Sequence, residues 1–177
     1  MSQPEFKIIK PGSEESRRLI EQCNLNDIHC SLDYLMLFSK YLSMEAIYAF
    51  YGDENNYILV PFLKKILTIR EAGEKYFDLI SPWYYGGPIC HTDSRNIATE
   101  IFGRWHEEFN SYCLENSIVS EFQRLNPVIE NHLLYQDDVS LFFNREIVCV
   151  DLKKSLEQIN QEYAYKVRKN NKASKAN

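Results

Sequence analysis

The sequence predicts an α/β domain in which a mixed, largely antiparallel sheet is flanked by helices. Three observations predict it: short segments of alternating apolar residues, longer segments with apolar residues at helical spacing, and the interleaving of the two along the chain. The chain has 177 residues, of which 45% are hydrophobic and 14% aromatic. This composition is enough for one domain with a sizeable core. We therefore expect residues 1–177 to form a single domain whose basic C-terminal end, 166–177, is frayed.

Strands are expected where apolar residues alternate between turn signals. The segment EAIYAFYG (45–52) alternates in this way, and GDENN then makes a hairpin-like turn into YILVPFLKKIL (57–67). Pro61 cannot donate to a ladder, so it indicates an edge strand or a bulge. Asn126 and Pro127 end a later strand as a strong breaker. The expected strands are, in order, 6–10, 45–52, 57–67, 75–80, 117–125 and two more on either side of Asn144 and Arg145, within 140–152.

Helices are expected after serines that can cap them. Ser13 precedes the first, and Ser31 precedes SLDYLMLFSKYL, in which apolar residues follow helical spacing. Ser155 and Gln158 form a capping box before a last helix over 155–170. The longest predicted helix, 94–116, carries one apolar face. That face consists of Ile97, Ile101, Trp105, Phe109 and Tyr112.

Charge and cysteine content limit the classes of partner. The net charge is −5, but residues 166–177 carry five basic residues and no acidic one, leaving −10 for residues 1–165. An acidic body makes nucleic acid an unsuitable main partner. No apolar run approaches the roughly 20 residues that a membrane span needs. The five cysteines are odd in number and scattered, which indicates neither a disulfide framework nor a zinc site and favours the cytoplasm.

The usual catalytic motifs are absent from the sequence. There is no P-loop, HExxH, GxSxG or EF-hand pattern. Cys90 and His91 are neighbours, but adjacent side chains of a strand point to opposite faces, so we do not expect a dyad. Residues 70–75 hold one arginine and one glycine, as a pyrophosphate-binding loop would. Lys75 replaces the small residue and Glu71 and Glu74 would repel phosphate, so we predict a hairpin turn and no bound cofactor.

The stretch SPWYYGGPI (81–89) concentrates three aromatic residues and two glycines between two prolines. With NYILVPFLKK, SIVSEFQRLNP and REIVCVDLKKSLEQINQEYAYKVRKNNKASK, it resembles the N-terminal half of FemAB-like acyltransferases. The better-known relatives are the peptidoglycan-bridge aminoacyl ligases. The resemblance covers roughly residues 45–175, and its glycine-loop and SEFxRLNP segments are fairly specific together.

The resemblance implies a GNAT-like fold and the transfer of an acyl or aminoacyl group to an amine. Family members have two GNAT-like halves, with the donor site mainly in the second half and the acceptor in the cleft between them. This chain resembles the first, acceptor-side half. We therefore expect an amine acceptor, such as a cell-wall precursor or a small molecule, while acyl-CoA or aminoacyl-tRNA would be the donor of a complete member. The alternative is a non-catalytic binding or interaction module derived from that fold.

The resemblance also implies which residues bind the acceptor. Trp83, Tyr84 and Tyr85 would form a stacking wall, and Gly86 and Gly87 would let the backbone approach a ligand closely. Arg124 and Asn126, at the end of a strand, would add a charged fork and an amide. The alternatives are a purely structural turn and an ion pair of Arg124 with Glu121 or a neighbouring acidic residue. No catalytic residue is predicted.

Two further expectations concern surfaces. The rings of the SPWYYGGPI stretch and the apolar side of the last helix, at Ile159, Tyr163 and Val167, would be covered in a homodimer or by a second lobe. The alternative is a monomer. The basic residues Lys166, Arg168 and Lys169 would lie near an anionic ligand or form a solvated helix end.

Overall fold

The computed structural model describes residues 3–23, 27–68, 75–92, 94–135, 139–165 and 167–168. The chain divides into two compact units, Met1–Ser140 and Leu141–Asn177, and each is described by itself. Residues 70–74 of the hairpin turn predicted at 70–75, and most of the basic end, lie outside the described residues.

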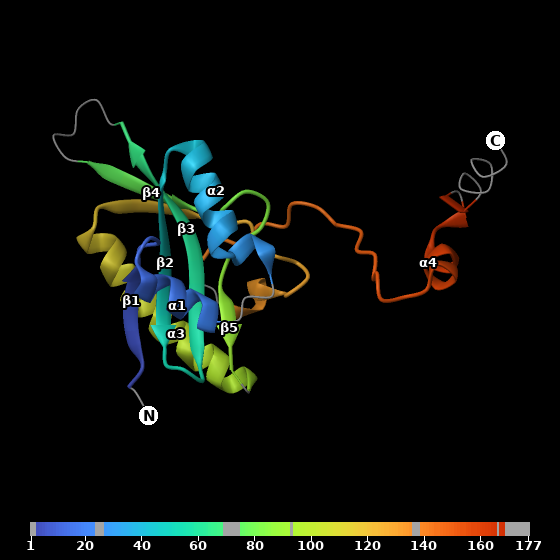
Figure 1. The fold of residues 1–177 in the computed structure, drawn as a ribbon, viewed down its shortest axis with the longest axis horizontal. Coiled ribbons are helices and arrows are strands. Elements are labelled where there is room, and N and C mark those ends of the chain that lie inside the picture. Colours follow the sequence, from blue (N-terminus) through green and yellow to red (C-terminus); the bar gives the residue numbers. More distant parts are fainter. Residues whose placement is uncertain are drawn as a thin grey trace. The chain divides into compact units, whose positions relative to one another are not determined.

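The first unit is built on a six-stranded mixed sheet (Figure 1). The strands are β1 (Glu5–Ile9), β2 (Glu45–Gly52), β3 (Tyr57–Leu67), β4 (Tyr76–Ile80), β5 (Ile89–His91) and β6 (Ile118–Phe122). They run in the order β1-β2-β3-β4-β6, and β5 pairs with β3. All pairs are antiparallel except β4 with β6, which is parallel. The predicted α/β class with a largely antiparallel sheet is confirmed.

Helices cover both faces of this sheet, because alternate residues of β2 and β3 belong to two different cores. Tyr48 and Leu59 pack with Leu35 of helix α2, whereas Ala49 and Val60 pack with Trp105 of helix α3. The helices of this unit are α1 (Glu14–Gln22), α2 (Leu32–Leu42) and α3 (Arg95–Glu115), with the 3-10 turns η1 (Ile28–Cys30) and η2 (Asn131–Leu134).

The predicted caps are confirmed. The Ser13 hydroxyl accepts from the Ser16 amide at 3.0 Å, and the Ser31 hydroxyl accepts from the Tyr34 amide at 3.3 Å. The long predicted helix is α3, capped by Ser94. Its buried face was partly wrong: Ala98 and Phe102 are buried in place of Ile97, which is 37% exposed. A helix advances 3.6 residues per turn, so a stripe chosen at strict four-residue steps drifts off the buried face.

Pro61 lies in a central strand, not at an edge of the sheet. β3 pairs with β2 along its whole length, but on its other side it pairs with β5 only through Tyr57–Leu59 and with β4 only from Leu63 onward. Pro61, which has no N–H to donate, falls in the gap between those two pairings. The gap is where the chain leaves the sheet between β4 and β5, over residues 81–88.

The second unit corrects a prediction. No strand is found in residues 141–152, and the apolar side chains of this segment are exposed: Phe142 by 87%, Phe143 by 83% and Val148 by 91%. A strand needs a neighbour to take up its backbone hydrogen bonds, and no such neighbour pairs with this segment in the described residues. The predicted last helix begins as expected, with the Ser155–Gln158 capping box, but α4 ends at Glu162 (Leu156–Glu162).

Candidate functional site

The segment between β4 and β5, residues 81–88, is called the aromatic loop here. It is tied to the residues that follow β6. The Ser81 amide donates to the Phe122 carbonyl at 2.9 Å, and the Ser81 hydroxyl accepts from the Arg124 amide at 3.1 Å. The Gly86 amide donates to the Arg124 carbonyl at 2.8 Å. Both ends of the loop are therefore held against one strand terminus, which gives the loop a defined shape.

The two glycines serve packing within the protein. A Cβ on Gly86 would lie 2.7 Å from the Ser81 Cβ. A Cβ on Gly87, whose φ is +89°, would lie 2.6 Å from Asn131 Nδ2 and 2.7 Å from a methyl group of Leu125. Protein atoms already fill the spaces that a Cβ would need, so both glycines have a structural reason, as the alternative of a structural turn expects. That they also let a ligand approach stays a prediction.

The aromatic rings, in contrast, face outward. Trp83 is 49% exposed and Tyr84 is 61% exposed, while Tyr85 is half-buried. Tyr84 has a φ of +69°, an uncommon conformation for a residue with a side chain. The Trp83 ring stacks on Phe38 of α2, with centroids 6.0 Å apart, and the Trp83 carbonyl accepts from the Tyr34 hydroxyl at 2.7 Å. Helix α2 thus holds the aromatic loop through its contacts with Trp83.

A histidine that the sequence analysis did not select lies among these rings. His29, in η1, has ring centroids 5.2 Å from Tyr34, 5.5 Å from Tyr85 and 6.5 Å from Tyr84. Its Nδ1 lies 2.7 Å from Asp27 Oδ1. The second Asp27 oxygen accepts from the Asn126 amide group at 2.5 Å. An Asp-x-His spacing just before a helix cap was the only local signal, and it is weak, because Asn126 is 99 residues away along the chain.

The structure brings Asn126 into this site but not as an exposed amide. Asn126 is 6% exposed, and its side chain donates to Asp27 and accepts from the Val128 amide at 2.9 Å. Arg124 is exposed, and its backbone rather than its guanidinium makes the contacts with the loop. The alternative ion pair with Glu121 is not among the ion pairs of the described residues, where Glu121 instead accepts from Gln123 at 2.5 Å.

A buried asparagine joins the loop to this network. Asn131 is 4% exposed, and its Nδ2 donates to the Gly86 carbonyl at 2.9 Å and the Pro88 carbonyl at 3.3 Å. Its Oδ1 accepts from the Asn126 amide at 2.9 Å. A continuous chain of hydrogen bonds therefore runs from the loop backbone through two asparagines to Asp27 and His29.

The cysteines of the first unit supply no reactive thiolate. All five are thiols, and only Cys149 is exposed. Burial raises the pKa of Cys23 to about 11, of Cys30 to about 12 and of Cys90 to about 11. A thiol with so high a pKa holds little thiolate near neutral pH. The His91 ring stacks on Tyr57, with centroids 5.0 Å apart. In the described residues, no group of three or more His, Cys, Asp or Glu side chains is arranged to hold a metal ion.

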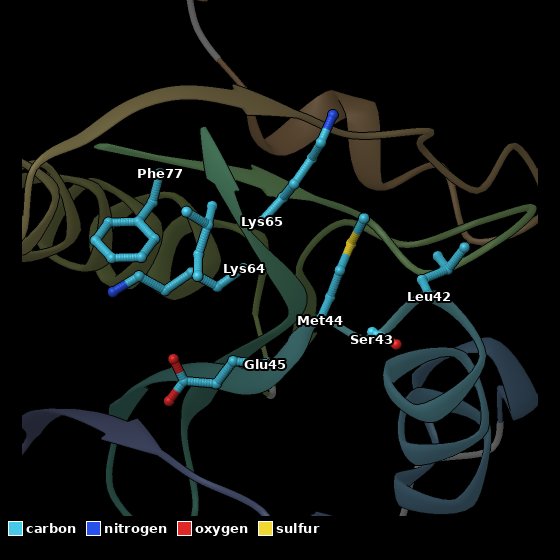
Figure 2. Close-up of a pocket in the computed structure, with 8 residues that line it drawn as sticks. Leu42, Ser43, Met44, Glu45, Lys64, Lys65 and Phe77 are labelled. Atoms are coloured by element: carbon cyan, nitrogen blue, oxygen red, sulfur yellow. The ribbon is translucent and has the colours of Figure 1, made fainter. Parts of the chain in front are cut away.

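A separate pocket of about 300 Å³ lies between the start of β2 and the end of β3 (Figure 2). Two of its three charged side chains are already engaged. The Lys64 ammonium lies 4.0 Å from the centroid of the Phe77 ring, and Glu45 pairs with Lys10 at 2.7 Å. Lys65 extends away from the Phe77 ring. The pocket has no hydrogen-bonded network comparable to the one at the aromatic loop.

Comparison with known proteins found no matching family model, no matching curated protein and no matching solved structure. The resemblance to FemAB-like acyltransferases therefore stays a prediction. In the part of the chain that the structure describes, no helix is both long and apolar enough to cross a membrane.

Proposed function

We propose that this chain binds the amine acceptor of an acyl or aminoacyl transfer, and that the acceptor lies on the rings of Trp83, Tyr84 and Tyr85. The observation that carries the proposal is the combination of outward-facing rings with a rigid support. Trp83 and Tyr84 are large and apolar yet exposed, and their backbone is held by hydrogen bonds to α2 and to the end of β6. A preorganised aromatic surface of this kind binds ligands without a large ordering penalty.

The strained backbone at Tyr84 supports the same reading. A φ of +69° costs about 1–2 kcal/mol for a residue with a Cβ, and such conformations cluster at ligand sites. A glycine here would avoid the strain but would leave no ring beside His29. The ring of Tyr84 is therefore a feature that the loop keeps at an energetic cost.

The two tryptophans make binding directly measurable. Trp83 is 49% exposed at the proposed site, whereas Trp105 is fully buried in the core of the sheet. A ligand that covers the loop should therefore change the emission of Trp83 and leave that of Trp105 unchanged. We would titrate the protein with a lysine-containing muramyl pentapeptide, which presents a primary amine on a cell-wall precursor, and with N-acetyl-lysine amide as a small amine.

We expect saturable quenching by the pentapeptide that is lost in Trp83→Phe and weakened in Tyr84→Ala. Tyr165→Ala is the matched control, because Tyr165 is also an exposed tyrosine, at 74%, and belongs to the second unit. Quenching that Tyr84→Ala leaves unchanged, or no quenching by either amine, would contradict the proposal. Binding without any transfer under the conditions described below would favour the non-catalytic binding module.

A further inference from the structure

The arrangement around His29 is more specific than a packing role requires. Asp27 accepts twice through Oδ1, from His29 Nδ1 at 2.7 Å and from the His29 backbone amide at 3.0 Å. Its Oδ2 accepts from Asn126. Both carboxylate oxygens are thus occupied, and the imidazole is fixed in one orientation. A carboxylate on Nδ1 selects the tautomer in which Nδ1 carries the proton and Nε2 carries the lone pair.

The other ring nitrogen remains available. No hydrogen bond to His29 Nε2 is present within the described part of the chain. The side chain is 24% exposed and that of Asp27 is 17% exposed, so the pair is largely shielded but reachable from solvent. The titratable groups that face the ring are Asp27, the N-cap residue of η1, Tyr34 from α2, and Tyr84 and Tyr85 from the aromatic loop.

We propose that His29 is the proton acceptor for the amine that attacks the acyl donor, and that Asp27 is the residue that positions it. This inference rests on the proposed function. The amine nitrogen uses its lone pair to form a bond to the carbonyl carbon of an activated thioester or oxyester. The carbon–sulfur or carbon–oxygen bond breaks, and its electron pair leaves on sulfur or oxygen. The proton passes from the nitrogen to His29 Nε2 and then to the leaving atom or to water, which completes the amide.

Chemistry favours a histidine for this task. Imidazole is the side chain whose proton affinity lies nearest neutral pH, and an amine nucleophile must lose a proton as it becomes an amide. The carboxylate of Asp27 stabilises the imidazolium that forms, as the orienting acid of a catalytic dyad does. The surrounding phenol rings limit access of water, and burial raises the pKa of the Tyr34 hydroxyl, so that Tyr34 stays neutral through the range where imidazole titrates.

The inference can be tested with a donor that needs no donor site. p-Nitrophenyl acetate is an activated oxyester in free solution, and acetylation of the pentapeptide amine can be followed by mass spectrometry. We expect the protein to accelerate this aminolysis and His29→Gln to lower the acceleration by about 100-fold, in the range of general-base contributions. His91→Gln is the matched control, because His91 is an exposed histidine that stacks on Tyr57 away from the network.

Steady-state kinetics separate a positioning role of Asp27 from a structural one. Asp27→Asn keeps the shape of the side chain and removes the charge that faces Nδ1, so kcat of the aminolysis should fall while KM for the pentapeptide stays near the wild-type value. Asp27→Glu, which keeps the charge, should recover part of the lost kcat.

Each outcome bears on one statement. The role of His29 is overturned if the pentapeptide binds and His29→Gln keeps the wild-type rate of aminolysis. It is also overturned if the pentapeptide binds and the native protein does not accelerate aminolysis. In both cases the acceptor surface of the aromatic loop is still supported. An unchanged kcat in Asp27→Asn overturns the role of Asp27. Failure of both the pentapeptide and N-acetyl-lysine amide to bind contradicts the proposed function and, with it, this inference.

Discussion

The shape of the aromatic loop depends on Gly87, and replacing this residue should destabilise the whole domain. In Gly87→Ala the new Cβ would meet Asn131 Nδ2 at 2.6 Å and Leu125 at 2.7 Å, both closer than real Cβ contacts allow. Alanine at a φ of +89° costs about 1–2 kcal/mol. If Asn131 moves, its hydrogen bonds to the Gly86 and Pro88 carbonyls weaken inside the protein. Leaving buried polar groups unsatisfied costs about 1–3 kcal/mol more.

The expected loss in the free energy of unfolding is therefore about 2–5 kcal/mol. Urea unfolding followed by circular dichroism measures it. With a slope of about 2 kcal/mol per molar urea, the midpoint should fall by about 1–2.5 M. The matched control is Gly103→Ala, because Gly103 lies inside α3 and a Cβ there meets nothing within 4 Å. That change should stabilise the protein by about 0.5–1 kcal/mol. A midpoint for Gly87→Ala within about 0.3 M of the wild-type value would refute the reasoning.

Three further outcomes follow from the described residues. Tyr48→Phe removes the hydroxyl that donates to the buried Cys30 carbonyl at 3.0 Å. It should lower the free energy of unfolding by about 1–3 kcal/mol in the same urea assay. An unchanged midpoint would show that the carbonyl finds another partner. Ellman's reagent at pH 8 should label Cys149 rapidly and Cys23, whose pKa burial raises to about 11, only on unfolding, and Cys149→Ser should abolish the rapid phase. Chymotrypsin should cut first in the exposed segment around Phe142 and leave the first unit folded, whereas first cuts within the sheet would contradict the division into two units.

Much of the fold could be predicted because its signals are local. Alternation over 45–52 and 57–67, the serines before the helices and the break at Asn126 each depend on neighbours in the sequence. The structure confirms β2, β3 and the caps for that reason, whereas β6 ends at Phe122, before the predicted end at residue 125. The prediction of two strands within 140–152 was wrong, because alternating apolar residues show only that a segment is able to join a sheet. Whether it does so depends on a partner strand elsewhere in the chain.

The candidate site was predicted only in part, for a related reason. The aromatic loop stood out by composition, and Trp83 and Tyr84 are exposed as a binding surface requires. The Asp27–His29 pair could not be predicted, because Asn126, which donates to Asp27, lies 99 residues away along the chain. The sequence left two roles open for the glycines, because a backbone that a ligand approaches closely and one that Asn131 approaches closely both require glycine.

The two explanations for Gly87, backbone conformation and close contact, can be separated by a double-mutant cycle with Asn131. Asn131→Ala alone removes the hydrogen bonds to the loop carbonyls and to the Asn126 amide, and should cost about 1–3 kcal/mol. In that background a Cβ at position 87 no longer meets Nδ2, and the Leu125 methyl group that it still meets at 2.7 Å can turn into the space left by the amide. Gly87→Ala should then cost mainly the conformational strain of about 1–2 kcal/mol. The sum of the single changes should then exceed the double change by about 1–3 kcal/mol, within the range for residues in contact. Costs that add to within about 0.5 kcal/mol would mean that the positive φ alone requires the glycine, and that Asn131 holds the loop independently of it.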